Sequence, residues 1–547
     1  MPRPPRPVQG RLIIPIAVMF FLSGAASLLY EVVWFRRLHL VFGVSVFAIG
    51  AVVAAFMLGL AAGSHWAASS LRLRRNPLRL YALLEVGIAV YAVLFPLLIQ
   101  ALEAVYVVLF RGFEGQFLLL SVLRFVLGLL LLLPPTFFMG ATLPALAQAV
   151  VRRPEGTARA AGWLYAINTL GGVIGTLAAG FYTLEHLGIS GSLIAGLCVN
   201  LAVALVAFVL SRRPGAATPH SEVEPAAAGG HRLPDRNGWL FKLALGVVAV
   251  TGLVSMAQEI IWTRALVFFV HNSTYAFSSI LAVYLLGLAA GASVGSRIAG
   301  GGRNPIAWLA GVLFAASLST IAAIAVYRHL PALAEPILGG RLDSSLAGLD
   351  ATNVWVVRSW LTALMGIFLQ VAAVLFLPSF FFGMIFPIAV WMLQQTGVSP
   401  ARLVGRLYTA NTVGCVLGTI LGTFVLVSLL GTRGSLLLLA WMPAAPALLA
   451  AWQSRSRRRA MSAAAAGGVL MIAAGLVAAP SGMYRQLFAD RFGEVIWFSE
   501  GVSETVAICE HDDGSAWIHY SDGRGASGTT SYRGRMALRA LAASPPS

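Results

Sequence analysis

Lysine is almost absent from this chain. Lys242 is the single lysine among 38 basic residues, so arginine carries nearly all of the net charge of +17. Charged residues make up 11% of the 547 residues, whereas they make up about 25% of soluble globular proteins. A chain that is 58% hydrophobic, with a mean hydropathy of +0.82, is too apolar for a water-soluble globule. The composition therefore predicts a membrane protein.

Cysteine is also scarce, and the familiar catalytic motifs are missing. Cys198, Cys415 and Cys509 are far apart, a spacing that excludes a disulfide framework or a zinc site. The sequence has no GxSxG elbow, no GxxxxGK[ST] phosphate loop and no HExxH pair. No catalytic residue and no metal ligand are therefore expected from the residues themselves.

An internal duplication organises what the chain does contain. The stretch from Ser23 to Ser64 recurs from Thr251 onward at one fixed offset. Its recurring residues are Gly24, Glu31, Trp34 and Arg36, which return as Gly252, Glu259, Trp262 and Arg264. After a short insertion the match continues, and Tyr165, Asn168, Gly171 and Gly175 return as Tyr408, Asn411, Gly414 and Gly418.

Apolar runs long enough to cross a bilayer, about 20 residues each, occur six times in each copy. The first six are expected near 12–35, 43–70, 79–101, 117–150, 160–183 and 189–211, and the second six near 239–265, 272–298, 305–328, 355–394, 402–428 and 433–453. An even number of helices gives both copies the same orientation, so an axis along the membrane normal should relate them.

The domain boundaries follow from these runs. We expect a basic N-terminal tail (1–11), a first membrane repeat (12–211), a linker (212–238), a second membrane repeat (239–453), a basic loop with an additional helix (454–480) and a soluble tail (481–547). Short β-branched and aromatic runs separated by HDDG and SDGRG turns predict strands in that tail. The predicted fold class is an all-α polytopic membrane protein of about 13 transmembrane helices, formed by two parallel six-helix repeats plus one helix and followed by a short β-rich tail.

The arginines lie in short clusters between the apolar runs. They fall in alternate loops, as the positive-inside rule requires of cytoplasmic loops. This placement predicts a cytoplasmic N-terminus, a cytoplasmic linker and a periplasmic C-terminal tail. It also makes the lipid bilayer the expected partner and speaks against nucleic acid, because no single face is basic.

Glu31 and Glu259 are carboxylates inside predicted spans, where ionisable residues are functional by default. Their partners would be Arg36 and Arg264, or each other across the two-fold axis. Each glutamate also lies three residues before a tryptophan, Trp34 or Trp262, of the kind found at the lipid interface. A solute or proton site and a structural ion pair near the headgroups therefore both remain open.

Further polar and small residues recur in the later helices of each repeat. Tyr165 with Asn168, and Tyr408 with Asn411, share one helical face and would either line a cavity or join helices by hydrogen bonds. The glycines at 171, 175, 414 and 418 predict close helix approach. The long fourth helix of each repeat contains prolines and a glycine at matching places, which are Pro135, Gly140 and Pro144 in the first repeat and Pro378, Gly383 and Pro387 in the second. Such interruptions either mark a transporter binding site or only shape the packing of the helix.

Several stretches resemble a bacterial family in which a duplicated, major-facilitator-like helical region is fused to a C-terminal spermidine-synthase-like domain. They are SGAASLLYEVVWFRRL, FMLGLAAGS, FFMGATLP and LYAINTLGGVIGT in the membrane part, and EGVSETVAI and HYSDGRGASGTTSY in the tail. The resemblance implies an inner-membrane location and a polyamine aminopropyltransferase-like domain using decarboxylated S-adenosylmethionine and putrescine. The family's Rossmann-like core follows the segment present here, so no catalytic or cofactor residue is carried over. An adenosylmethionine-type cofactor is expected only where a missing core domain is supplied.

Three functions follow from these patterns. The first is transport or recognition of a small solute, for which the carboxylates and the resemblance suggest a cationic amine such as a polyamine. The second is a membrane-bound polyamine aminopropyltransferase whose catalytic core is missing or lies on a neighbouring chain. The third is a membrane scaffold that docks a partner protein through its C-terminal tail.

Overall fold

A computed structural model gives the fold of residues 10–529 with gaps. Outside the described residues lie 1–9, 44–45, 70–75, 114, 152–153, 213–234, 271–272, 300–303, 331, 334–353, 395, 397, 453–474, 476–481, 502–504, 511–515, 521–524 and 530–547. The predicted N-terminal tail, most of the linker, the additional helix within 454–480 and the last part of the tail therefore fall outside these residues.

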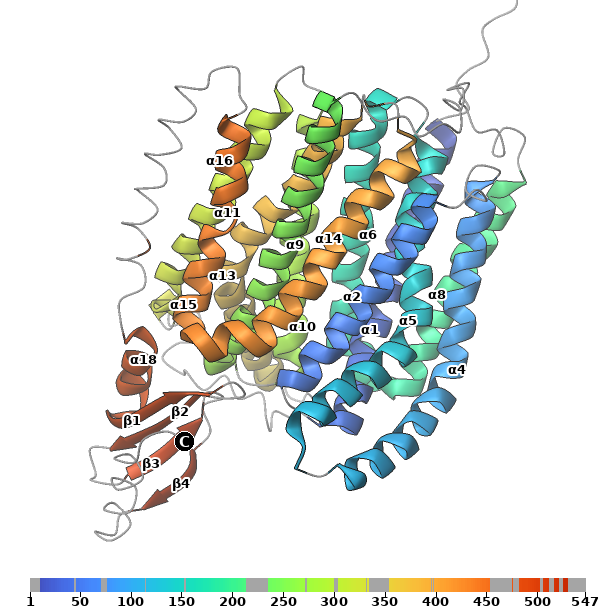
Figure 1. Cartoon of the computed structure of the whole chain (residues 1–547). Coiled ribbons are helices and arrows are strands. Elements are labelled where there is room, and N and C mark those ends of the chain that lie inside the picture. The colour runs from blue at the N-terminus through green and yellow to red at the C-terminus, as the bar shows by residue number, and fades with distance from the viewer. Residues whose placement is uncertain are drawn as a thin grey trace, which may run out of the picture.

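Each repeat folds as a set of long helices standing side by side (Figure 1). The first repeat consists of α1 (Gly10–Phe42), α2 (Val46–Ser69), α4 (Pro77–Gly112), α5 (Phe117–Val150), α6 (Thr157–Ala178) and α8 (Gly188–Ser211). The second consists of α9 (Asp235–Val270), α10 (Thr274–Ile298), α11 (Pro305–Tyr327), α13 (Val354–Leu393), α14 (Pro400–Ile420), α15 (Val427–Trp441) and α16 (Ala444–Trp452).

Eleven helical stretches of the described chain are long and apolar enough to cross a membrane. One of them, Pro400–Leu448, runs from α14 through α15 into α16, and its backbone breaks inside α15 at Gly431 with φ of 66°. Gly188 has the matching φ of 65° at the start of α8. The prediction of a polytopic α-helical membrane protein is confirmed.

Equivalent helices make equivalent contacts in the two repeats. The first helix of each repeat packs against the fifth, α1 on α6 and α9 on α14, and the second packs against the fourth, α2 on α5 and α10 on α13. The repeats meet where α2 packs on α14 and α6 packs on α10. Each of these two contacts is the symmetry mate of the other, as expected for parallel repeats around one axis.

Local sequence explains why the third helices begin alike. Asn76 caps α4 by accepting a hydrogen bond from the Arg79 amide at 3.0 Å, and Asn304 caps α11 by accepting one from the Ile306 amide at 3.0 Å. In both repeats a proline follows the cap, at the first helical position, where its missing N–H has no cost.

A short π-helical segment follows the fifth helix of each repeat. These segments are η2 (Ala179–Thr183), which continues into α7 (Leu184–His186), and η3 (Leu421–Leu426). Such wide turns are rare within helices and often lie near functional sites. Their recurrence shows that the duplication extends to irregular backbone.

Proline does not break the fourth helix of either repeat. Pro135 cannot donate to the Leu131 carbonyl, and the Tyr91 hydroxyl of α4 donates to that carbonyl instead. The backbone acceptor freed by the proline is thereby satisfied inside protein, as a membrane span requires. Helices α5 and α13 each continue through their prolines as one element.

The C-terminal tail forms a small module, which we define as α18 (Met483–Phe492), β1 (Glu494–Glu500), β2 (Thr505–Glu510), β3 (Ala516–Tyr520) and β4 (Gly525–Thr529). Its four strands form one antiparallel sheet in the order β1-β2-β3-β4. The predicted β-rich tail is confirmed. The module lies against one end of the helical bundle, beside the second repeat (Figure 1).

Candidate functional site

The structure brings Glu31 of α1 and Glu259 of α9 together across the boundary between the repeats. The two carboxyl groups are close enough for their charges to repel each other. Both side chains are half-buried. The two residues occupy the same position in their repeats, so the duplication itself generates this pair of acids.

Tyrosines from both repeats surround the pair. Tyr408 of α14 lies within electrostatic range of Glu31, and Tyr284 of α10 lies within range of Glu259. Tyr165 of α6 faces Tyr408 across the ring of Phe386, whose centroid is 5.4 Å from the ring of Tyr165 and 6.3 Å from that of Tyr408. Two carboxyl groups and three phenols therefore occupy one region between the repeats, which we call the central site.

The arginines that were predicted as partners of the glutamates form hydrogen bonds with other groups. Arg36 donates instead to Thr274 Oγ1 at 3.1 Å, and Arg264 donates to the Gly501 carbonyl at 2.5 Å. Each arginine follows its glutamate by five positions, a spacing that places side chains about 140° apart around an α-helix. The ExxWxR spacing therefore directs the acid and the base to different sides.

The interpretation of Trp34 and Trp262 as interfacial belt residues is wrong. Their side chains are 1% and 0% exposed. Trp34 stacks on Tyr30 and on Phe95, each with ring centroids 5.2 Å apart, and Trp262 packs on Tyr327 at 5.6 Å. A belt tryptophan keeps one edge in the headgroup layer, whereas these rings fill the interior of their repeats.

Asn168 and Asn411 join helices in the same way in both repeats. The Asn168 amide donates to the Phe20 carbonyl of α1 at 3.1 Å, and the Asn411 amide donates to the Val248 carbonyl of α9 at 3.2 Å. Both asparagines remain half-buried. Each amide thus fastens a fifth helix to the first helix that carries the central-site glutamate.

Sequence reasoning overlooked a third intramembrane carboxyl group. Glu85 of α4 is 0% exposed and accepts hydrogen bonds from Ser23 Oγ at 2.6 Å and from Asn200 Nδ2 at 2.5 Å. The sequence signal that could have identified Glu85 is the presence of an acidic residue within the predicted span 79–101. It was missed because it has no counterpart in the second repeat, where Leu313 stands in its place.

Hydrogen bonds join the two repeats at both ends of the bundle. At one end Arg36 donates to Thr274, and the Tyr275 hydroxyl donates to Glu185 Oε2 at 3.0 Å. At the other end Ser64 Oγ donates to the Gly405 carbonyl at 3.0 Å. A small pocket beside Glu31, lined by residues of α1, α2 and α5, has room for about one water molecule.

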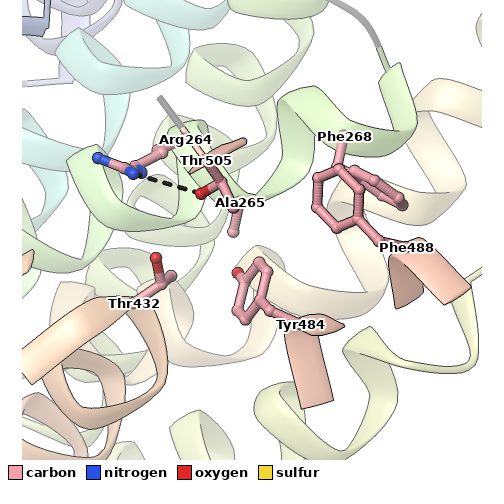
Figure 2. A pocket seen from close by; sticks show the side chains of 7 residues that line it. All are labelled: Arg264, Ala265, Phe268, Thr432, Tyr484, Phe488 and Thr505. Atoms are coloured by element: carbon pink, nitrogen blue, oxygen red, sulfur yellow. Dashed lines mark hydrogen bonds between the residues drawn. The ribbon is translucent and has the colours of Figure 1, made fainter. Parts of the chain in front are cut away.

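The C-terminal module docks on the second repeat through Arg264 and its neighbours (Figure 2). The side chain of Arg264 also donates to Thr505 Oγ1 at 3.4 Å, and the ring of Phe488 lies 4.9 Å from that of Phe268. Glu500 Oε2 accepts a hydrogen bond from the Thr432 amide at 2.8 Å, just after the backbone break of α15.

Tyr484 lines a small pocket at this contact, together with Arg264 and Thr505 (Figure 2). Burial raises the pKa of its hydroxyl well above the ordinary value, so the phenol stays neutral. The pocket has room for about one water molecule, which makes this region a packed contact rather than a ligand cavity.

Among the described residues, no group of three or more His, Cys, Asp or Glu side chains is arranged to hold a metal ion.

No family model matches the chain, and no curated protein matches it. Solved structures with a similar arrangement of helices include the fucose:proton symporter FucP of E. coli, with a TM-score of 0.46 and 15% identity over 81% of this chain and 99% of that one. They also include the nucleoside transporter NupG (TM-score 0.44, 14% identity, 80% and 97% covered) and the human organic anion transporter MFSD10 (0.43, 12%, 81% and 100%). Scores below 0.5 at this identity establish no activity for this chain.

Proposed function

We propose that the chain transports a small cationic amine, with a polyamine such as spermidine or putrescine as the solute. The observation that carries this proposal is the meeting of Glu31 and Glu259 across the boundary between the repeats. Transporters built from two parallel repeats bind their solutes near the midplane, between the repeats.

The chemistry of the central site favours a cation. Two carboxylates that repel each other in a membrane-buried site are stabilised by a positive charge placed between them. Aromatic faces add cation–π attraction, and Tyr165 and Tyr408 supply such faces from opposite repeats. A diamine would offer one ammonium group to each carboxylate.

The contacts between the repeats favour transport over a static scaffold. Polar contacts join the repeats at both ends of the bundle: Ser64 with Gly405, Ala158 with Gln394 and Ala401 with Gln148 at one end, and Arg36 with Thr274 and Tyr275 with Glu185, beside the stacked rings of Phe35 and Phe277, at the other. Breaking one set while keeping the other would open the central site to a single side of the membrane, as alternating access requires.

We place the protein in a bacterial inner membrane with its N-terminus in the cytoplasm, since arginines cluster in alternate loops. The module lies at the end of α9 that carries Arg264 and Phe268, which on this orientation is the periplasmic end.

Uptake into proteoliposomes tests the proposal. Purified protein should accumulate radiolabelled spermidine or putrescine above empty liposomes, and Glu31→Gln combined with Glu259→Gln should lower the initial rate at least about tenfold, because the charged partners of the amine are removed. Glu103→Gln serves as the matched control, since Glu103 is an exposed acid on α4. Absence of uptake of both amines by folded wild-type protein would contradict amine transport, and full uptake by the double variant would remove the carboxylates from the site.

A further inference from the structure

Glu85 lies at the meeting point of three helices of the first repeat, away from the central site. Its two oxygens accept separate hydrogen bonds, one from Ser23 of α1 and one from Asn200 of α8. Glu85 and Asn200 are 0% exposed and Ser23 is 2% exposed. The carboxyl group is therefore enclosed completely by α1, α4 and α8.

No cation faces this carboxyl group from the described parts of these helices. The titratable groups that face it are the phenols of Tyr81 and Tyr30, and a phenol is neutral at physiological pH. Helix α5 also packs against α4. Its Arg124 donates a hydrogen bond to the hydroxyl of Tyr106, which lies near the C-terminal end of α4 and several turns from Glu85. A charge enclosed without a counter-ion is costly in a membrane, whereas a neutral acid is tolerated.

The amide of Asn200 can form a hydrogen bond with Glu85 in either protonation state of the acid. Asn200 Nδ2 donates to the carboxylate as observed, while Asn200 Oδ1 is buried and has no hydrogen-bond partner in the described chain. Rotation of the Asn200 side-chain amide by 180° would exchange Nδ2 and Oδ1, so that a protonated Glu85 could donate a hydrogen bond to Oδ1. Asn200 Oδ1 would thus accept a hydrogen bond only when Glu85 is protonated. A site that gains and loses a proton needs such an acceptor for its protonated state.

The second repeat shows that the fold does not need this cluster. Thr251, Leu313 and Pro443 occupy the positions of Ser23, Glu85 and Asn200, and Leu313 is 0% exposed. A leucine thus fills the same space between equivalent helices. Since a buried polar network adds little stability over apolar packing, its presence in one repeat alone points to a chemical role.

We propose that Glu85, Ser23 and Asn200 form a proton-binding site that takes up and releases one proton when the packing of α1 against α4 and α8 changes. Ser23 lies on the helix that carries Glu31, so the charge state of the site acts on the helix that forms the central site. The proton site does not depend on which solute, if any, the central site binds.

Infrared difference spectroscopy of the purified protein in lipid nanodiscs tests the proposal, with the proton itself as the probe. The wild-type protein should show a protonated-carboxyl C=O band that shifts in D2O and disappears as the pH is raised within about pH 5 to 9. Glu85→Gln should lose this band. Glu31→Gln with Glu259→Gln and the exposed control Glu103→Gln should keep it.

Asn200→Leu supplies a second measurement, because it removes the alternating partner and leaves the acid. Its band should remain but titrate at a shifted pH. Glu85→Leu should elute as a monodisperse protein, as Leu313 of the second repeat leads us to expect. A spectrum in which Glu85→Gln removes no band would overturn the proposal, and so would a Glu85 band that stays constant over the whole pH range, since that result defines a purely structural acid.

Discussion

The two repeats share a backbone arrangement but differ in their polar side chains. In both, glycines of the fifth helix touch carbonyls of the first, and an asparagine of the fifth helix bonds to a carbonyl of the first. The first repeat alone holds the cluster of Glu85, Ser23 and Asn200. The second repeat instead holds a Gln258–Thr320 pair, with Gln258 at the position of Tyr30.

This difference separates what the fold requires from what each repeat does. The shared contacts end on backbone atoms, which occupy the same places in both copies whatever the neighbouring side chains are. The unshared contacts join one side chain to another, and each was free to change after duplication. Residues present in both copies include the scaffold contacts and the paired glutamates, whereas the Glu85 cluster occurs in the first copy and the contact of Arg264 with the C-terminal module in the second.

The shared glycines should give the largest effect. A Cβ at Gly171 would lie 1.9 Å from the Phe21 carbonyl, and one at Gly414 would lie 2.0 Å from the Ala249 carbonyl. Gly171→Ala and Gly414→Ala should each lower the free energy of unfolding by about 3 kcal/mol, because helix α6 or α14 must move away from its partner. Thermal unfolding followed by size-exclusion chromatography measures this. Gly246→Ala, where a Cβ meets nothing within 4 Å, is the control; unequal losses at 171 and 414 would break the equivalence of the repeats.

The arginines at equivalent positions should differ in effect. Arg264→Ala removes the hydrogen bonds to Gly501 and Thr505, which hold the C-terminal module on α9. Cleavage within the module by limited proteolysis should become about tenfold faster, as expected for the loss of one charge-assisted hydrogen bond. Arg36→Ala should leave that rate unchanged, because Arg36 contacts Thr274 and not the module. Equal acceleration by both variants would contradict this assignment.

The paired asparagines should give the smallest effect. Asn168→Ala and Asn411→Ala each remove one interhelical hydrogen bond, worth about 1 kcal/mol in a membrane protein. The apparent melting temperature should fall by about 1 to 2 °C in each variant, and the two changes should add, since the bonds involve different helices. A fall confined to one variant would show that the repeats use this bond differently.

Sequence patterns located the central-site residues but not their partners. The duplication identified Glu31, Glu259, Tyr165 and Tyr408, and the structure places them around one region. Of the two predicted partners of each glutamate, the structure favours the other glutamate over the nearby arginine, because sequence proximity ignores the direction in which a helix points its side chains. Glu85 was overlooked for the opposite reason, since a search guided by repetition passes over a residue that occurs once.

The sequence by itself determined that this is a multi-pass membrane protein of two parallel repeats with a β-rich tail, because apolar run length, repeated motifs and turn residues are local properties of the chain. Only the tertiary structure decided which side chains meet. The neighbours of Glu31, the enclosure of Glu85 and the docking of the module on Arg264 all join residues distant in sequence. Such contacts depend on how the helices cross and rotate, and no local pattern encodes that.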